Sequence, residues 1–223
     1  MPYTFSYLKH RLALLSTPLV TQQVLCKTLT GLEVPLITVN ELATARPHRY
    51  IIINARTHPG ESSASWVADG LLAHLAASAL LHQLLAEFAV VLKVVPMLNV
   101  EGVCLGNYRT GTMGMDFNRL FLSGSPDLFP EIAALKRLVE ECKARGRVDL
   151  FLDLHGHSIL PGCFMYGPDP VFAPKTALGR LVGEMGKSRY FMKGHCVQGV
   201  DSSKAETSRI YFQAQEGVFS LTC

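Results

Sequence analysis

The sequence predicts an α/β fold built around a largely parallel or mixed sheet. Three continuous apolar runs, residues 49–55, 89–98 and 148–154, have the pattern of strands buried on both faces. Stretches with helical spacing separate these runs, as expected when strands alternate with helices. Hydrophobic residues make up 48% of the 223 residues and charged residues 17%, so the chain is globular, and its length favours one domain.

The first half of the chain supplies a helix, a hairpin and the first two buried strands. Residues 3–15 have helical apolar spacing, and residues 21–39 predict two short strands around a Thr-Gly turn. The buried strand over 49–55 leads into a helix predicted over 61–80. Residues 80–98 predict a further helix followed by the next buried strand.

The second half continues this alternation and ends in strands. Residues 130–146 predict an amphipathic helix, and the buried strand over 148–154 follows it. We predict another helix after Pro174, within residues 171–186, and two late strands over 209–215 and 217–222. In such sheets chemistry collects at the C-terminal ends of the strands, so polar residues there are the candidates for function.

Charge and composition argue against several classes of partner. The net charge is +3 and the Lys and Arg residues are scattered, so we expect no nucleic-acid partner. The most apolar stretch, residues 80–98, contains His82, Glu87 and Lys93, which is unfavourable for a membrane span. The N-terminus lacks the apolar core and cleavage signal of a secretory leader. Six cysteines without close pairs indicate reduced thiols, and we expect a cytoplasmic protein.

His58 and Glu61 form the first candidate site, at the end of the strand over 49–55. A Pro-Gly bend separates them, so both side chains can converge on one point. A glutamate in the first turn of a helix is also favoured by the helix dipole. The alternative interpretation is a capping glutamate beside an unrelated surface histidine, because the pattern HxxE is loose.

A second group of the same kind ends the strand over 148–154. Asp153, His155 and His157 alternate along the chain, so they leave the strand on one side. A catalytic zinc commonly takes two His and one Glu and keeps a fourth position for water. His58, Glu61 and one of the later histidines fit that pattern, and spacing alone does not decide which histidine.

A glycine-rich loop lies between the two groups. It carries Arg109 and Arg119, with Asn107 and Asn118 as amide neighbours. Arginine offers planar bidentate donors for a carboxylate and can stabilise an oxyanion. The alternative is a solvated loop with surface arginines.

These motifs together, in this order, resemble a known family. HxxE, then a GNYR…GxDxNR loop, then DLHGHS resemble the M14 zinc carboxypeptidases, most closely the cytosolic carboxypeptidase branch, the tubulin deglutamylase family. The segment PYTFS near the N-terminus is similar to a segment just before the catalytic domain of that branch. The resemblance runs along nearly the whole chain. It implies that residues 1–223 form one catalytic domain, incomplete at its C-terminus, with a three-layer fold in which helices flank a mixed, mostly parallel sheet.

The resemblance also implies a ligand set. One Zn²⁺ per chain would be bound by His58, Glu61 and His155. Asp116 would orient a zinc histidine from outside the coordination sphere. His157 would be a neighbour of the site and not a ligand.

The substrate-binding roles follow in the same way. Arg109 would polarise the scissile carbonyl and hold the developing oxyanion. Asn118 and Arg119 would grip the C-terminal carboxylate of the substrate. The implied reaction is removal of C-terminal residues, glutamate in this branch, from acidic protein tails such as those of tubulin.

Three departures from the family pattern bear on activity. The run over residues 99–103 replaces the usual NPDG, so we expect that turn to differ in detail. We also expect the amino-terminal β-sandwich domain of the family to be absent. The last residues, FSLTC, stop at Cys223, one position before the glutamate that serves the family as general base, and Glu216 lies at the wrong place to replace it. We therefore expect the 223-residue chain to hydrolyse peptides slowly.

Two other functions remain open at this stage. The same zinc site could cleave N-acyl amino acids, as related deacylases of the wider superfamily do. A zinc-binding or protein-binding module without catalysis is the second alternative, and the missing general base favours it.

Overall fold

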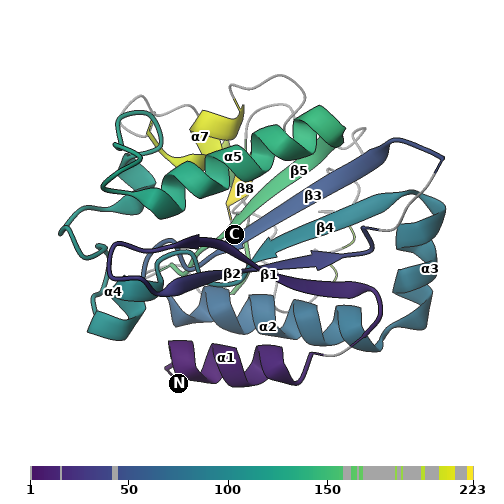
Figure 1. The fold of residues 1–223 in the computed structure, drawn as a ribbon, viewed down its shortest axis with the longest axis horizontal. Helices are drawn as coiled ribbons and strands as arrows, with labels where there is room; N and C mark the ends of the chain where they lie inside the picture. Colours follow the sequence, from purple (N-terminus) through teal and green to yellow (C-terminus); the bar gives the residue numbers. More distant parts are fainter. Residues whose placement is uncertain are drawn as a thin grey trace.

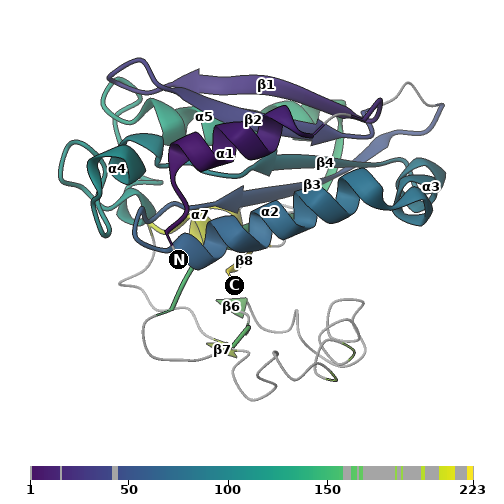
Figure 2. The same ribbon diagram turned by 90° about the horizontal axis from the view of Figure 1, so that it is seen from below.

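The computed structural model describes residues 2–15, 17–41, 45–157, 162–164, 166–167, 184, 187, 197–198, 206–213 and 220–222. Within this part of the chain, eight strands form one mixed sheet in the order β1-β2-β4-β3-β5-β8-β6-β7. Helices α5 and α7 lie over one face of the sheet, and α1 and α2 lie over the other (Figures 1 and 2). The predicted three-layer α/β fold is confirmed.

The N-terminal helix and hairpin form as the sequence predicts. Helix α1 (Phe5–Ala13) begins after Thr4, whose side chain accepts a hydrogen bond from the Tyr7 amide. Strands β1 (Val20–Lys27) and β2 (Glu33–Val39) pair antiparallel, and β1 lies at one edge of the sheet. Gly31 turns the hairpin with φ of 86°, a conformation that favours glycine.

The three predicted buried strands form the parallel centre of the sheet. Strand β3 (His48–Ala55) lies between β4 (Val90–Val95) and β5 (Gly146–Leu154) and is parallel to both, while β2 joins β4 antiparallel. Ile52 of β3 is completely buried. Burial of such a side chain contributes about 1.5–3 kcal/mol. Because both faces are covered, apolar side chains follow one another in these strands instead of alternating strictly with polar ones.

The helix predicted over residues 61–80 and the further helix predicted at the start of residues 80–98 are both present, and the boundary between them lies at Ser78. Helix α2 (Ser62–Ala77) stops at Ser78, and α3 (Ala79–Glu87) begins there, because the Ser78 hydroxyl accepts the Leu81 amide. Among the described residues, no single helix has the length and apolarity of a membrane span. The pair α2 and α3 meets those criteria only jointly, with a bend of 86° between them.

The remaining helices frame the loop that follows β4. Helix α4 (Val100–Leu105) begins after Asn99, whose side-chain oxygen accepts the Gly102 amide, and a short 3₁₀ helix, η1, spans Phe117–Arg119. Helix α5 (Pro130–Arg145) confirms the amphipathic helix predicted over 130–146.

The strand predicted over residues 209–215 is wrong, because the structure has helix α7 (Ser208–Gln213) there. Ser208 and Phe212, one helical turn apart, are both fully buried. The Phe212 ring packs 4.3 Å from that of Phe151 in β5. This contact with the sheet, which no local pattern records, outweighs the β-propensity of the aromatic residues.

The last strands are short. Strand β8 (Ser220–Thr222) pairs parallel to β5, within the strand predicted over 217–222. Strands β6 (Tyr166–Gly167) and β7 (Val197–Gln198) were not predicted from the sequence. The expectations for Glu216, for Cys223 and for nearly all of residues 171–186 lie outside the described residues.

Candidate metal centre

The pairing of β3 with β5 brings the two histidine groups together. In this parallel pair Ala55 lies opposite Leu154, so both strands end at the same edge of the sheet. His58 and Glu61 follow β3 by a few residues, and His155 follows β5 directly. The three side chains, up to 97 residues apart in sequence, therefore meet as expected at the C-terminal ends of parallel strands.

The donor atoms of His58, Glu61 and His155 converge on one point. The two Nδ1 atoms are 3.1 Å apart, and the Glu61 carboxylate oxygens lie 2.8 Å from Nδ1 of His58 and 2.9 Å from Nδ1 of His155. A tetrahedral zinc ion with bonds of ~2.0–2.1 Å separates its ligands by about 3.3 Å. Across the described part of the chain, this is the one group of three or more such side chains spaced to hold a metal ion.

Each imidazole is held by a carboxylate on its other nitrogen. Nε2 of His58 lies 3.0 Å from Asp116, and Nε2 of His155 lies 2.9 Å from Asp153. These partners assign the Nε2–H tautomer to both rings and direct the Nδ1 lone pairs to the shared centre. Two lone pairs and a carboxylate that face one another need a cation between them, so the donor set fits a metal ion.

Asp153 is the ligand-orienting residue to which the sequence analysis gave no role. Its carboxylate is completely buried and accepts hydrogen bonds from Asn54 at 2.8 Å, Thr57 at 3.2 Å and the Ser208 hydroxyl. The alternation of Asp153 and His155 along β5 puts both on one side of the strand, and that pattern contained the necessary information. Asn54 and Ser208 carried no comparable sequence pattern.

The charges of the cluster favour a cation at its centre. Burial opposes ionisation of Glu61, but hydrogen bonds and the charges of His155 and His58 outweigh it and lower the pKa of this carboxyl. For His155, burial disfavours the charged form, yet the carboxylates of Asp153 and Glu61 prevail and raise its pKa, so a metal ion bound at Nδ1 takes the place of a proton there. The two carboxylates therefore stay ionised and attract positive charge.

The Pro-Gly turn between His58 and Glu61 packs tightly against the loop that carries Arg109. The Gly60 amide donates to the Tyr108 carbonyl at 2.7 Å. A Cβ atom on Gly60 would lie 2.6 Å from that same oxygen, so only glycine fits without displacement of the loop. The turn thus fixes the two predicted ligands and the arginine loop relative to each other.

The predicted substrate-binding residues lie around Asp116, whose carboxylate contacts Arg109 and the Asn118 amide and whose carbonyl accepts the Arg119 amide. Arg109 is partly exposed and reaches the centre through Asp116, which its Nε contacts at 2.8 Å. Asn118 is 8% exposed, and its side-chain oxygen accepts the Ser208 amide at 2.9 Å. Arg119 is exposed and donates to the Asn118 carbonyl at 2.7 Å.

His157 and Glu101 lie outside the donor group. His157, expected as a neighbour and not a ligand, is outside the donor group, and its ring lies 5.2 Å from that of Phe164. Glu101, in the run that departs from NPDG, is buried and accepts hydrogen bonds from Thr30 and Thr112. It thereby ties the hairpin turn to the arginine loop.

The solved structures to which this fold is similar include metallocarboxypeptidases. A metallo-carboxypeptidase from Burkholderia cenocepacia has a TM-score of 0.83 and 26% identity, and the match covers 99% of this chain and 60% of that one. A putative carboxypeptidase A from Shewanella denitrificans has the same TM-score and identity. No family model matches the sequence. This fold, with the donor group at the ends of its parallel strands, is similar to that of the M14 metallocarboxypeptidases.

Within that family the chain is homologous to the cytosolic carboxypeptidases. Cytosolic carboxypeptidase 1 of Mus musculus is 39% identical, with 97% of this chain covered, and cytosolic carboxypeptidase 2 of Xenopus tropicalis is 34% identical, with 94% covered. The chain spans only about a fifth of the length of these relatives, 20% and 23% respectively.

Proposed function

We propose that this chain is the catalytic domain of a cytoplasmic zinc carboxypeptidase that removes C-terminal glutamate from acidic protein tails, such as those of tubulin. The observation that supports it most strongly is the meeting of two imidazole Nδ1 atoms, 3.1 Å apart, with the Glu61 carboxylate. Zinc is the metal that this donor set suits best, since a His₂Glu set is a common catalytic zinc site.

The residues around the donor atoms have separate roles in binding the metal and the substrate. A zinc ion held there would polarise the scissile carbonyl and lower the pKa of a bound water. Asp116 and Asp153 keep the imidazoles in the tautomer that presents Nδ1. Arg109 lies next to Asp116 on the exposed side of the centre, where its guanidinium can donate to the substrate carbonyl oxygen.

A negatively charged substrate end fits the arginine side of the centre. Arg119 is exposed, and its guanidinium offers a planar fork to a terminal carboxylate, with the Asn118 amide beside it. Arg109 adds a second cation nearby. This pair of arginines supports acidic tails as substrates and acidic proteins as partners, and it requires no nucleic acid or membrane.

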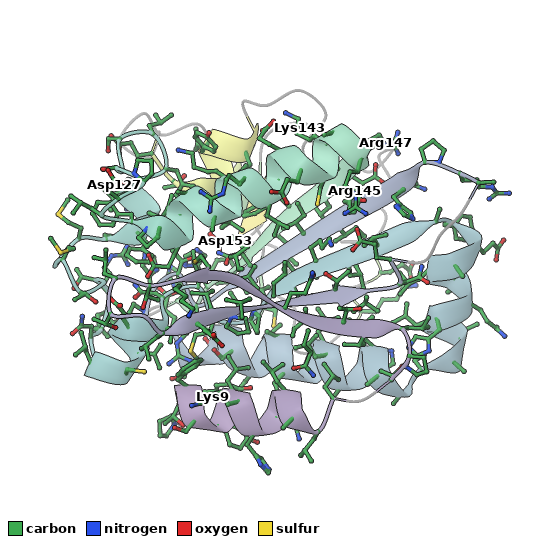
Figure 3. All side chains as sticks on the ribbon, in the orientation of Figure 1. Lys9, Asp127, Lys143, Arg145, Arg147 and Asp153 are labelled. Carbon is green, nitrogen blue, oxygen red and sulfur yellow. The ribbon has the colours of Figure 1, made fainter. Side chains whose placement is uncertain are left out.

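The carboxylate clamp can be tested with two arginine substitutions. Arg119→Ala should lower kcat/KM on glutamate-tailed peptides by about 10–100-fold, because a hydrogen bond to a charged group contributes ~1.5–3 kcal/mol. Arg147→Ala is the matched control, since Arg147 and Asp153 lie at opposite ends of β5 (Figure 3). Equal losses in the two variants would argue against the clamp.

The same assay separates the competing functions. It should use the 223-residue chain and, where the gene continues past Cys223, a version with the following residues. Faster cleavage of N-acyl glutamate than of peptides would favour the deacylase, and zinc binding without turnover in either version would favour a non-catalytic module.

A further inference from the structure

Arg56 lies between the end of β3 and the turn that carries His58 and Glu61, and none of the roles above uses it. The residue is 4% exposed. Its backbone has φ of 59°, in the left-handed region that residues other than glycine rarely adopt. Such a conformation persists only where surrounding contacts over-determine it, and it is found preferentially at functional sites.

The guanidinium of Arg56 connects three segments of the chain. Nε donates to the Pro59 carbonyl, inside the ligand turn, at 2.7 Å. Nη1 donates to the Ser65 hydroxyl at 2.9 Å and to the Tyr3 carbonyl at 3.2 Å, and Nη2 donates to the Ser62 hydroxyl at 3.3 Å. The side chain therefore fixes the ligand turn against the first turn of α2 and against the N-terminal segment.

All four of these acceptors are neutral, although a buried arginine is usually paired with a carboxylate. Burial lowers the pKa of Arg56, and the negative charge of Glu61 opposes that effect. The Glu61 oxygens, however, are directed to His58 at 2.8 Å and to His155 at 2.9 Å. The arginine thus arranges the backbone around Glu61 and leaves its carboxylate for the centre.

We infer that Arg56 is a positioning residue for the metal centre: it holds the Pro59 carbonyl and the start of α2, and so sets the orientation in which His58 and Glu61 meet His155. The inference rests on the proposed metal site. Residues that orient ligands from outside the coordination sphere typically change metal affinity by about 10–100-fold when substituted.

The test measures zinc affinity by competition with a chromophoric chelator on folded protein. Arg56→Met should weaken zinc binding by about 10–100-fold. Arg56→Lys keeps the charge but lacks the planar fork, and should fall between Arg56→Met and the unmodified protein. With Co²⁺ as probe, Arg56→Met should also change the visible absorption of the bound ion, which a loss of stability alone would leave unaltered.

The control is Arg11→Met. Arg11 joins α1 to α2 through Asp69 at 2.8 Å, away from the ligand turn, so its loss should lower the melting temperature without changing zinc affinity or the Co²⁺ spectrum. If Arg56→Met does not fold, Ser65→Ala decides instead. It removes one acceptor of the guanidinium and should weaken zinc binding by about fivefold.

The outcomes are distinct for the two proposals. If folded Arg56→Met binds zinc within twofold of the affinity of the unmodified protein, the positioning role is overturned and the metal centre is not. The same holds for Ser65→Ala if Arg56→Met does not fold. Failure of the unmodified protein to bind zinc would overturn the metal centre, and the positioning role with it.

Discussion

Glu131, in the first turn of α5, provides a direct test of the electrostatics of this fold. Its side chain is buried, with 2% of the residue exposed. Burial raises the pKa of Glu131 from its ordinary value of 4.5 to about 7, and the nearby Glu101 carboxylate adds to the effect. The folded chain therefore holds a proton here that the unfolded chain has already released near neutral pH.

The sign of the effect follows from this difference. Because the pKa of Glu131 is higher in the folded state, protonated Glu131 contributes its full stabilisation of the fold below pH 4.5. That contribution is lost as the pH rises to 7. At ~1.36 kcal/mol per pH unit, the loss between pH 5 and pH 8 is roughly 2–3 kcal/mol. Glu131→Gln resembles the protonated form and does not titrate, so it should escape that loss.

The assay compares the melting temperatures of the unmodified protein and Glu131→Gln at pH 5 and pH 8. The variant should gain about 5–10 °C relative to the unmodified protein between the two pH values. Subtraction of the variant removes the contributions of the other titrating groups, which both proteins share. A difference that stays constant from pH 5 to pH 8 would show that Glu131 ionises like a surface carboxyl and would refute the reasoning.

Three further predictions concern the centre and its supports. Asp153→Ala should destabilise the fold by about 3–5 kcal/mol in urea unfolding, because it leaves His155 and three other donors without their acceptor. Gly60→Ala should lower the free energy of unfolding by about 1–3 kcal/mol, because the new Cβ forces Tyr108 away. Gly70→Ala should raise it by about 0.5–1 kcal/mol, because a Cβ there meets nothing within 4 Å. Changes of the same sign in the two variants would contradict this packing. Chelation of zinc should lower the melting temperature by about 5–10 °C, since zinc at 100 times its Kd contributes ~2.7 kcal/mol, and an unchanged value would argue against a bound metal.

The central strands and the donor group could be predicted because the relevant information is local. Buried parallel strands are apolar along their length, so residues 49–55 and 148–154 were recognisable. Polar residues directly after such strands must meet at one edge of the sheet once the strands pair in parallel. The strand ends, together with the family resemblance, therefore predict His58, Glu61 and His155 from the sequence.

What the sequence did not predict depends on contacts between distant segments. Helix α7 is a helix because Phe212 and Ser208 pack on the sheet, and the sequence around them resembles a strand. Arg56 and Glu101 were not singled out because their partners are backbone atoms and hydroxyls on other segments. Such partners leave no spacing pattern in a single sequence.

The central proposal is that His58, Glu61 and His155 bind one zinc ion, and zinc K-edge X-ray absorption of the loaded protein tests it most directly. The account predicts one zinc per chain, with nitrogen and oxygen ligands at ~2.0–2.1 Å including two imidazoles, and loss of this site in the double substitution His58→Ala and His155→Ala. Sulfur ligands at ~2.3 Å, or an unchanged spectrum and zinc content in the double variant, would contradict it.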